Sequence, residues 1–210
     1  MNALGCSGAA VPASSGGEPR DVMLSLGTMT STSFTNPPGR AKARASAYVR
    51  SILALLGDRD PIVVQSRLVR SIRSAIRGLP GRALERPEAR GKWSIMQVIR
   101  HLADSEVVFG WRLRLVLAED RPRVTPFDQD AWMERLAGAY PDLDAALATL
   151  AVLRAANVAL MRSLSKPQWL RIGLHSERGP ESVRQMARLY AGHDLVHVNQ
   201  IRRIRKAIGR

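Results

Sequence analysis

The chain has few of the features that mark secreted or membrane proteins. Cys6 is the only cysteine among 210 residues, so no internal disulfide can form, and a reducing, cytoplasmic setting is predicted. No apolar run approaches the roughly 20 residues that a transmembrane helix needs. The segment from Met1 to Gly17 lacks the basic start and apolar stretch of a signal peptide. The sequence therefore predicts a protein without a membrane partner.

Acidic residues are also scarce, at 18 against 32 basic ones, which gives a net charge of +14. Such a charge is typical of surfaces that bind nucleic acid. The arginines are scattered rather than gathered into one tract, and aromatic residues make up only 5% of the chain. No basic–aromatic pattern for base stacking results. A generally arginine-rich composition is the favoured interpretation, and nucleic acid is a less favoured partner.

The first 43 residues differ in composition from the rest of the chain. They are rich in Ser, Gly, Ala, Pro and Thr, and they show neither a helical nor a strand period. Such a composition predicts a disordered N-terminal tail over residues 1–43 and one folded domain over residues 44–210. Met23 and Met29 lie inside this tail, so translation could also begin later than Met1.

Four segments of the domain carry the apolar spacing and the end signals of long helices. Asp60 followed by Pro61 predicts one helix start, and Ser94 with Gln97 three residues later predicts another through a capping box. No segment alternates as a β-strand does. The expected fold is an all-α four-helix bundle. Its helices are expected over residues 61–78, 94–118, 142–164 and 182–208.

The connections between these helices bear on their order in space. A short apolar pattern covers residues 46–56, a short helix is expected near residues 128–136, and residues 165–181 are expected to form an irregular loop. The connection over residues 119–141 is long enough for the second and third helices to run parallel. An up-down-down-up order is therefore possible, whereas short loops would make all neighbours antiparallel.

Three of the four histidines form a candidate metal site. His193 and His197 are four residues apart, so both rings lie on one helix face, among apolar residues that point into the bundle. His101, on another apolar helix, is the candidate third ligand. Three histidines would leave one coordination position open for water, and they suit one divalent ion such as Zn, Ni or Fe. The alternative is a set of core histidines with ordinary hydrogen bonds.

The spacing of His193 and His197 also invites comparison with the His-Glu-x-x-His motif of zinc proteases. Asp194 stands where that motif has its glutamate, and its side chain is one methylene shorter. No Asp, Glu or His follows His197 that could act as a downstream third ligand. A metalloprotease is therefore not expected.

Four motifs occur in a fixed order along the domain. They are Trp93-Ser94-Ile95, His101-Leu102-Ala103-Asp104-Ser105-Glu106 with Arg112 and Arg114 after it, Phe127-Asp128-Gln129-Asp130-x-Trp132, and His193-Asp194-x-x-His197-x-x-Gln200-Ile201. In order and spacing the chain resembles the DinB-like (damage-inducible) superfamily from about Tyr48 to the C-terminus. The branch that it resembles most contains metal-dependent hydrolases and bacillithiol transferases.

The resemblance implies an up-down-down-up bundle and a metal site formed by His101, His193 and His197. It also implies a possible homodimer and, for some members, transfer of a low-molecular-weight thiol to an electrophile. Because the domain contains no cysteine, such a thiol would have to be a co-substrate. The sequence does not identify catalytic residues beyond the metal ligands.

Three further residues are candidates for a role near the metal. Asp104 could orient an imidazole through its N–H group, or it could be a surface carboxylate paired with an arginine. Arg112 could bind an anionic group of a substrate, or it could be solvated or ion-paired. His175 could carry protons at the mouth of a pocket, or it could be an exposed loop histidine.

Two classes of function follow as leading hypotheses. The first is a metal-dependent enzyme, either a hydrolase or a thiol S-transferase, that acts on a small molecule. The second is a non-catalytic stress-response module in which metal stabilises the fold. Binding of nucleic acid through the basic surface is a third, less favoured hypothesis.

Overall fold

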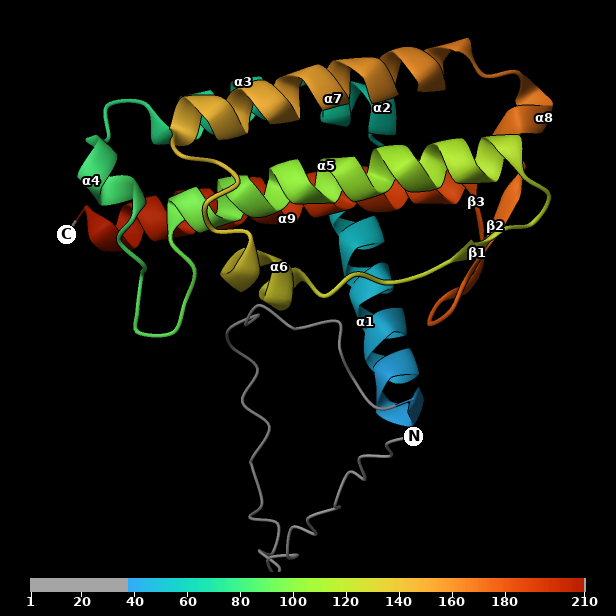
Figure 1. The fold of residues 1–210 in the computed structure, drawn as a ribbon, viewed down its shortest axis with the longest axis horizontal. Helices are drawn as coiled ribbons and strands as arrows, with labels where there is room; N and C mark the ends of the chain where they lie inside the picture. Colours follow the sequence, from blue (N-terminus) through green and yellow to red (C-terminus); the bar gives the residue numbers. More distant parts are fainter. Residues whose placement is uncertain (1–37, 210) are drawn as a thin grey trace, which may run out of the picture.

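Four long helical segments lie side by side as a bundle (Figure 1). The computed structural model describes the backbone of residues 38–209 and side chains from residue 46 onward; of the tail predicted over residues 1–43, residues 1–37 lie outside this range. The colours in Figure 1 show that α5 and α7 run in one direction and that the first segment and α9 run in the other. The predicted all-α bundle with up-down-down-up order is confirmed. Its segments are α2 (Pro61–Ser66) with α3 (Leu68–Ile76), α5 (Ile95–Ala118), α7 (Leu143–Ser163) and α9 (Val183–Ile208).

The helix starts follow from local hydrogen bonds that the sequence predicts. The Asp60 carboxylate accepts from the backbone N–H groups of Ile62 and Val63. Ser94 and Gln97 form the reciprocal capping box, with N–O distances of 3.3 and 2.9 Å. Each such cap satisfies N–H groups that the first turn of a helix leaves free. One expectation was wrong: the helix predicted over residues 61–78 is interrupted at Arg67, whose N–H bonds to carbonyls within α2.

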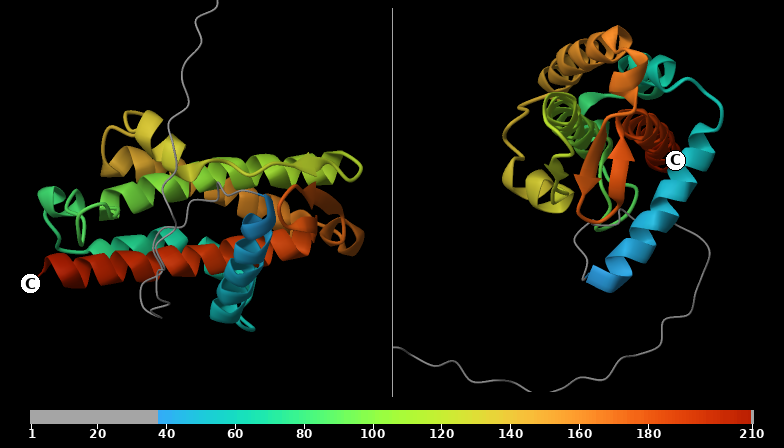
Figure 2. Two further views of the ribbon diagram at one scale, coloured as in Figure 1. Left: turned by 90° about the horizontal axis from the view of Figure 1, so that it is seen from below. Right: turned by 90° about the vertical axis from the view of Figure 1, so that its right-hand side faces the viewer.

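Helix α1 (Pro38–Leu56) lies outside the bundle. It packs against α9 and then projects away from it (Figure 2). Its backbone is helical from Pro38, so residues 38–43, which were expected to belong to the tail, continue this helix. The contact with α9 is very close at Gly192, because a Cβ atom there would lie 2.5 Å from the carbonyl oxygen of Ile52. A glycine at this position lets α1 rest directly on the α9 backbone.

A small sheet closes one end of the bundle (Figure 1), although no strand was expected. It consists of β1 (Arg123–Val124), β2 (Ile172–His175) and β3 (Gly179–Ser182), with β1 parallel and β3 antiparallel to β2. Strands of two to four residues are too short to show a period of two in the sequence. The remaining short helices are α4 (Gly81–Leu84), α6 (Gln129–Arg135) and α8 (Lys166–Trp169).

The hydrophobic core is divided into two parts along the bundle. One cluster joins α3, α4 and the first half of α5 to the first half of α7 and the last half of α9. The other joins the last half of α5 to the last half of α7 and the first turns of α9. Buried polar side chains from four helices fill the level between them, and we call this group the polar layer. Its members are Gln65, Glu106, Arg154, Asn157 and Asp194.

Helix α7 is long and apolar enough to cross a membrane by length and composition alone, with a mean hydropathy of 1.5. The expectation that no apolar run approaches the length of a transmembrane helix was therefore wrong for residues 143–163. In the structure α7 packs against α5 and α2, and its Arg154 is buried in ion pairs with α5 and α9. These contacts are those of a bundle helix.

Gly192→Ala tests the close approach of α1 to α9. The new methyl group would overlap the Ile52 carbonyl, and the backbone of one helix would have to move. We expect a loss of about 1–3 kcal/mol in the free energy of unfolding, measured by urea denaturation. Gly138→Ala is the matched control, because nothing lies within 4 Å of a Cβ atom at that glycine. Equal stability of the two variants would contradict the close contact.

Candidate metal centre

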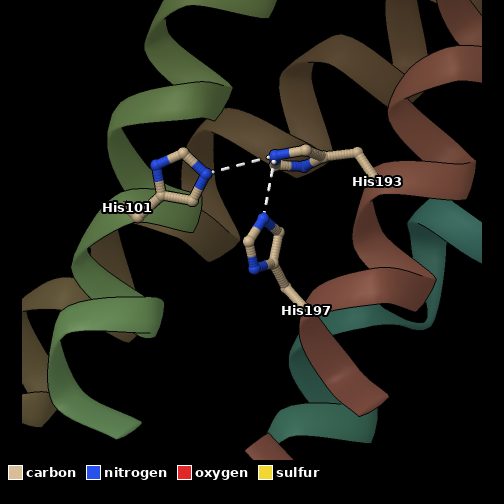
Figure 3. Close-up of side chains that lie close together, drawn as sticks. All are labelled: His101, His193 and His197. Carbon is tan, nitrogen blue, oxygen red and sulfur yellow. Dashed lines mark hydrogen bonds between the residues drawn. The ribbon is translucent and has the colours of Figure 1, made fainter. Parts of the chain in front are cut away.

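Three imidazole rings from two helices meet in the middle of the bundle (Figure 3). His101 comes from α5, and His193 and His197 come from successive turns of α9. The Nε2 atom of His193 lies 3.1 Å from Nε2 of His101 and 3.1 Å from Nε2 of His197. One ligand atom from each histidine lies within 4.8 Å of the others. The structure thus brings together the three residues that the sequence proposed as ligands.

The surroundings of the three rings favour their neutral form. Burial lowers the pKa of all three imidazoles, and for His197 it lowers the pKa to about 4. For His101 and His193 the neighbouring histidines lower the pKa further. A neutral imidazole has a lone pair on one nitrogen, which is the form that binds metal.

Gln200 fixes the orientation of one ring. Its Oε1 atom lies 2.7 Å from Nδ1 of His197, one turn further along α9. A proton on Nδ1 that is donated to this oxygen leaves the lone pair of His197 on Nε2, which faces the other two histidines. A partner of this kind, which sets the tautomer of a ligand, is typical of metal-binding histidines.

The distances fit a divalent ion better than a metal-free cluster. Ligands bound tetrahedrally at about 2.0–2.1 Å are separated from one another by about 3.4 Å, close to the two separations of 3.1 Å. Without an ion, only one of these two contacts can be an ordinary hydrogen bond, because Nε2 of a neutral His193 carries either one proton or one lone pair. The other pair of Nε2 atoms would lie 3.1 Å apart without a hydrogen bond of its own. Three Nε2 lone pairs directed at one ion remove this conflict.

A pocket with a cavity volume of about 80 Å³ opens beside the histidines. Its walls come from α1, α5, α9, the segment before α6 and the turn between β2 and β3. His101 and His193 contribute to it directly, so a ligand in the pocket would contact the proposed metal site. The lining residues are Tyr48, Ile52, His101, Ser105, Arg112, Pro126, Phe127, Gln129, Arg178, Leu189, Tyr190 and His193.

Asp104 and Arg112, two of the additional candidates, lie in different surroundings. The Asp104 carboxylate accepts from the hydroxyl of Tyr140 at 2.8 Å. Within the described part of the chain, no hydrogen bond joins it to a histidine. Neither interpretation of Asp104 holds, since it is buried and its partner is a tyrosine. Arg112 is buried and lines the pocket, where it donates to Tyr190 and to the carbonyl of Thr125.

His175 is neither an exposed loop residue nor a proton carrier for neutral pH. It ends strand β2, is 3% exposed and does not line the pocket. Its Nδ1 atom accepts from the backbone N–H groups of Glu177 and Arg178 at 3.2 and 3.4 Å. Burial, followed by the charges of Arg178 and Arg112, lowers its pKa to about 3. The residue shapes the turn between β2 and β3 as a neutral side chain.

The polar layer contains an ion-pair network that the sequence did not reveal. Arg154 of α7 binds Asp194 of α9 through two N–O contacts of 2.5 and 3.1 Å, and Glu106 of α5 at 2.6 Å. Asn157 donates to the same glutamate at 2.7 Å. Burial raises the pKa of Asp194 to about 6, although the charge of Arg154 opposes this shift. The network therefore ties three helices together immediately beside His193.

Comparison with known proteins supports the resemblance to the DinB-like superfamily. Residues 66–201 match the DinB superfamily. YfiT from Bacillus subtilis, whose name proposes a metal-dependent hydrolase, is 28% identical over 183 residues, which are 86% of this chain and 99% of YfiT. A relative from Bacillus licheniformis with the same kind of name is 32% identical over 139 residues, 66% of this chain and 79% of the relative.

A solved structure of YfiT has the same fold. It superimposes with a TM-score of 0.66 at 28% sequence identity, over 71% of this chain and 86% of the YfiT chain. That protein is described as having an unusual four-helix bundle topology.

Arg154→Met tests the polar layer. The substitution would leave two buried carboxylates without their cation, and we expect the free energy of unfolding to fall by about 3–5 kcal/mol. Urea denaturation measures this loss, and Arg162→Met, an exposed position on the same helix, is the control. The triple variant Arg154→Met/Glu106→Gln/Asp194→Asn removes all three charges and should recover part of the stability. An Arg154→Met protein as stable as the wild type would contradict the network.

His175→Gln tests the buried neutral histidine through pH. Between pH 6.5 and about 3 the unfolded chain binds a proton at His175 that the folded chain does not, so this residue makes stability fall as the pH falls. The wild type should lose up to about 1.4 kcal/mol per pH unit relative to the variant over this range. Urea denaturation at pH 4 to 7 measures the difference. The contributions of the other histidines to the pH dependence cancel, because both proteins contain them. If the free energy of unfolding changed with pH in the same way in both proteins, this account of His175 would be contradicted.

Proposed function

The chain belongs to the DinB superfamily, and from this premise we propose that it is a metal-dependent hydrolase whose ion is held by His101, His193 and His197. The observation that carries the proposal is the convergence of three imidazole Nε2 atoms beside a pocket that His101 and His193 line. Relatives whose names propose metal-dependent hydrolases support the same assignment.

The donor set suits a catalytic ion. Three imidazole ligands with an open position are typical of catalytic sites, whereas structural zinc sites have four protein ligands. Within the described residues, the group of three histidines contains no carboxylate or thiolate that would close the site. Imidazole nitrogens suit Zn, Ni or Fe, and a divalent ion of this kind supplies Lewis acidity and makes bound water more acidic.

Other residues of the chain orient the histidines and form the wall of the pocket. Gln200 holds the proton on His197 Nδ1, and Ser105 lies 3.4 Å from His101 Nε2 at the pocket wall. Phe127 and Tyr190 contribute aromatic surface to the pocket wall. The modest size of the pocket favours a small-molecule substrate over a polymer.

Transfer of a low-molecular-weight thiol is the second candidate function. A metal ion acidifies a thiol as it does water, and the same pocket would accommodate the electrophile. The domain contains no cysteine, since Cys6 is the only one in the chain and precedes the described residues. A thiol would therefore have to enter as a separate substrate. The homodimer and the cytoplasmic location stay predictions.

Metal analysis of the purified, untagged protein tests the proposal. We expect about one Zn, Ni or Fe per chain in the wild type and none in the His193→Ala/His197→Ala variant, because one remaining imidazole cannot retain the ion. His175→Gln is the matched control and should keep its metal, because His175 lies outside the cluster. Elemental analysis is followed by assays with activated esters, with and without added thiols.

Two outcomes would contradict the proposal in different ways. A wild-type protein that is isolated metal-free and fails to bind added Zn²⁺ or Ni²⁺ would remove the metal site itself. A protein that binds metal but turns over neither esters nor thiol acceptors would favour the non-catalytic module, in which the ion only stabilises the bundle. Thermal denaturation with and without metal would then show that stabilisation.

A further inference from the structure

We infer that the pocket beside the three histidines binds a small molecule with a carboxylate group, and that Arg112 is the residue that binds this anion. The inference rests on the proposed function, since the other end of the substrate would react at the metal. It names the chemical class of the substrate, which neither the family nor the relatives specify. The argument starts from the charge of Arg112 and its surroundings.

Arg112 is a buried cation without a counter-ion in the described part of the chain. It is 6% exposed, and its guanidinium donates to the Tyr190 hydroxyl at 3.1 Å and to the carbonyl of Thr125. Both acceptors are neutral, and no salt bridge joins Arg112 to a carboxylate between residues 46 and 209. A buried charge without a partner of opposite sign lowers stability. An anionic ligand would supply the missing charge.

Arg154, the other buried arginine, differs from Arg112 in its charge partners. Arg154 lies in the same bundle, and it has two carboxylate partners, Glu106 and Asp194. Arg178, at the other side of the pocket, is paired with Glu181. Among these three arginines only Arg112 faces the pocket with its charge uncompensated. Of these three arginines, Arg154 and Arg178 are neutralised by carboxylates and Arg112 is not.

The geometry of Arg112 suits a carboxylate. The bonds to Tyr190 and Thr125 fix the plane of the guanidinium and use two of its five N–H groups. The Tyr190 ring is itself held by stacking on the buried Phe109, with centroids 4.2 Å apart. A guanidinium with a fixed plane and free N–H groups binds a carboxylate through two parallel hydrogen bonds.

The rest of the pocket agrees with an anionic ligand. None of the described residues that line it is an aspartate or glutamate, whereas Arg112 and Arg178 both line it. The two arginines also lower the pKa of nearby His175, as expected for a region of positive potential. The pocket includes His101 and His193, so a bound carboxylate and the proposed ion would contact the same small molecule.

Calorimetric titration of the zinc-loaded protein tests this inference. The probes are malonate, succinate and glutarate, each compared with its monoamide, which keeps one carboxylate for the metal but lacks the second. We expect at least one diacid to bind tenfold or more tightly than its monoamide, and we expect Arg112→Gln to reduce this ratio to about one. Arg100→Gln is the matched control, because Arg100 lies on the same helix and pairs with Glu85 outside the pocket.

Arg112→Lys covers the case in which Arg112→Gln fails to fold, since it keeps the charge but cannot form two parallel bonds. In this variant the ratio of diacid affinity to monoamide affinity should fall several-fold. The inference is overturned if the wild type binds every diacid no more tightly than its monoamide, or if the ratio is unchanged in the folded Arg112 variants. Repeating the titration on metal-free protein separates the two proposals. There the single carboxylate of a monoamide should bind Arg112 directly, and Arg112→Gln should weaken that binding even if no metal site exists.

Discussion

The ion-pair network of Arg154 is the interaction on which the rest of the structure depends. It links α7 to Glu106 of α5 and to Asp194 of α9, and those two helices carry all three histidines of the candidate metal centre. Asp194 directly follows His193, so the contact that holds the aspartate also sets the rotation of α9 at this point. A bidentate arginine–carboxylate pair restricts orientation as well as distance. The network therefore joins the two helices that carry the three rings, and one of its members is adjacent to His193 in the chain.

A buried ion-pair network of this kind is seldom needed for stability alone. Apolar side chains of similar volume often stabilise a core as well as a buried ion pair or better, because charges lose their hydration on burial. Here the polar layer separates two apolar clusters that could otherwise have been continuous. Its position beside the histidines suggests the reason: it holds α5 and α9 in register where imidazoles must meet within 3.1 Å. Stability on both sides of the layer comes from the two apolar clusters.

The sequence predicted those features that are encoded locally. Asp60 and Ser94 mark helix starts by bonding to their own neighbours, and the spacing of His193 and His197 places two rings on one face. Features that depend on distant partners were missed. Arg154 is one arginine among many, and nothing near it in the chain indicates that Glu106 and Asp194 will neutralise it. Strands β2 and β3 are too short for a period, and the contact of Ile52 with Gly192 joins residues 140 positions apart.

The two buried arginines show how structural and ligand-binding charges can be distinguished. Both lie deep in the bundle, so both lose hydration, and a folded protein tolerates that loss only where something compensates for it. Arg154 is compensated within the protein by two carboxylates, and its role is complete once the chain has folded. Among the described residues Arg112 has only neutral acceptors, and it lines a pocket to which His101 and His193 also contribute. No carboxylate among the described residues neutralises Arg112, and the anionic ligand that we propose would do so, which is the property that separates a binding residue from a structural one.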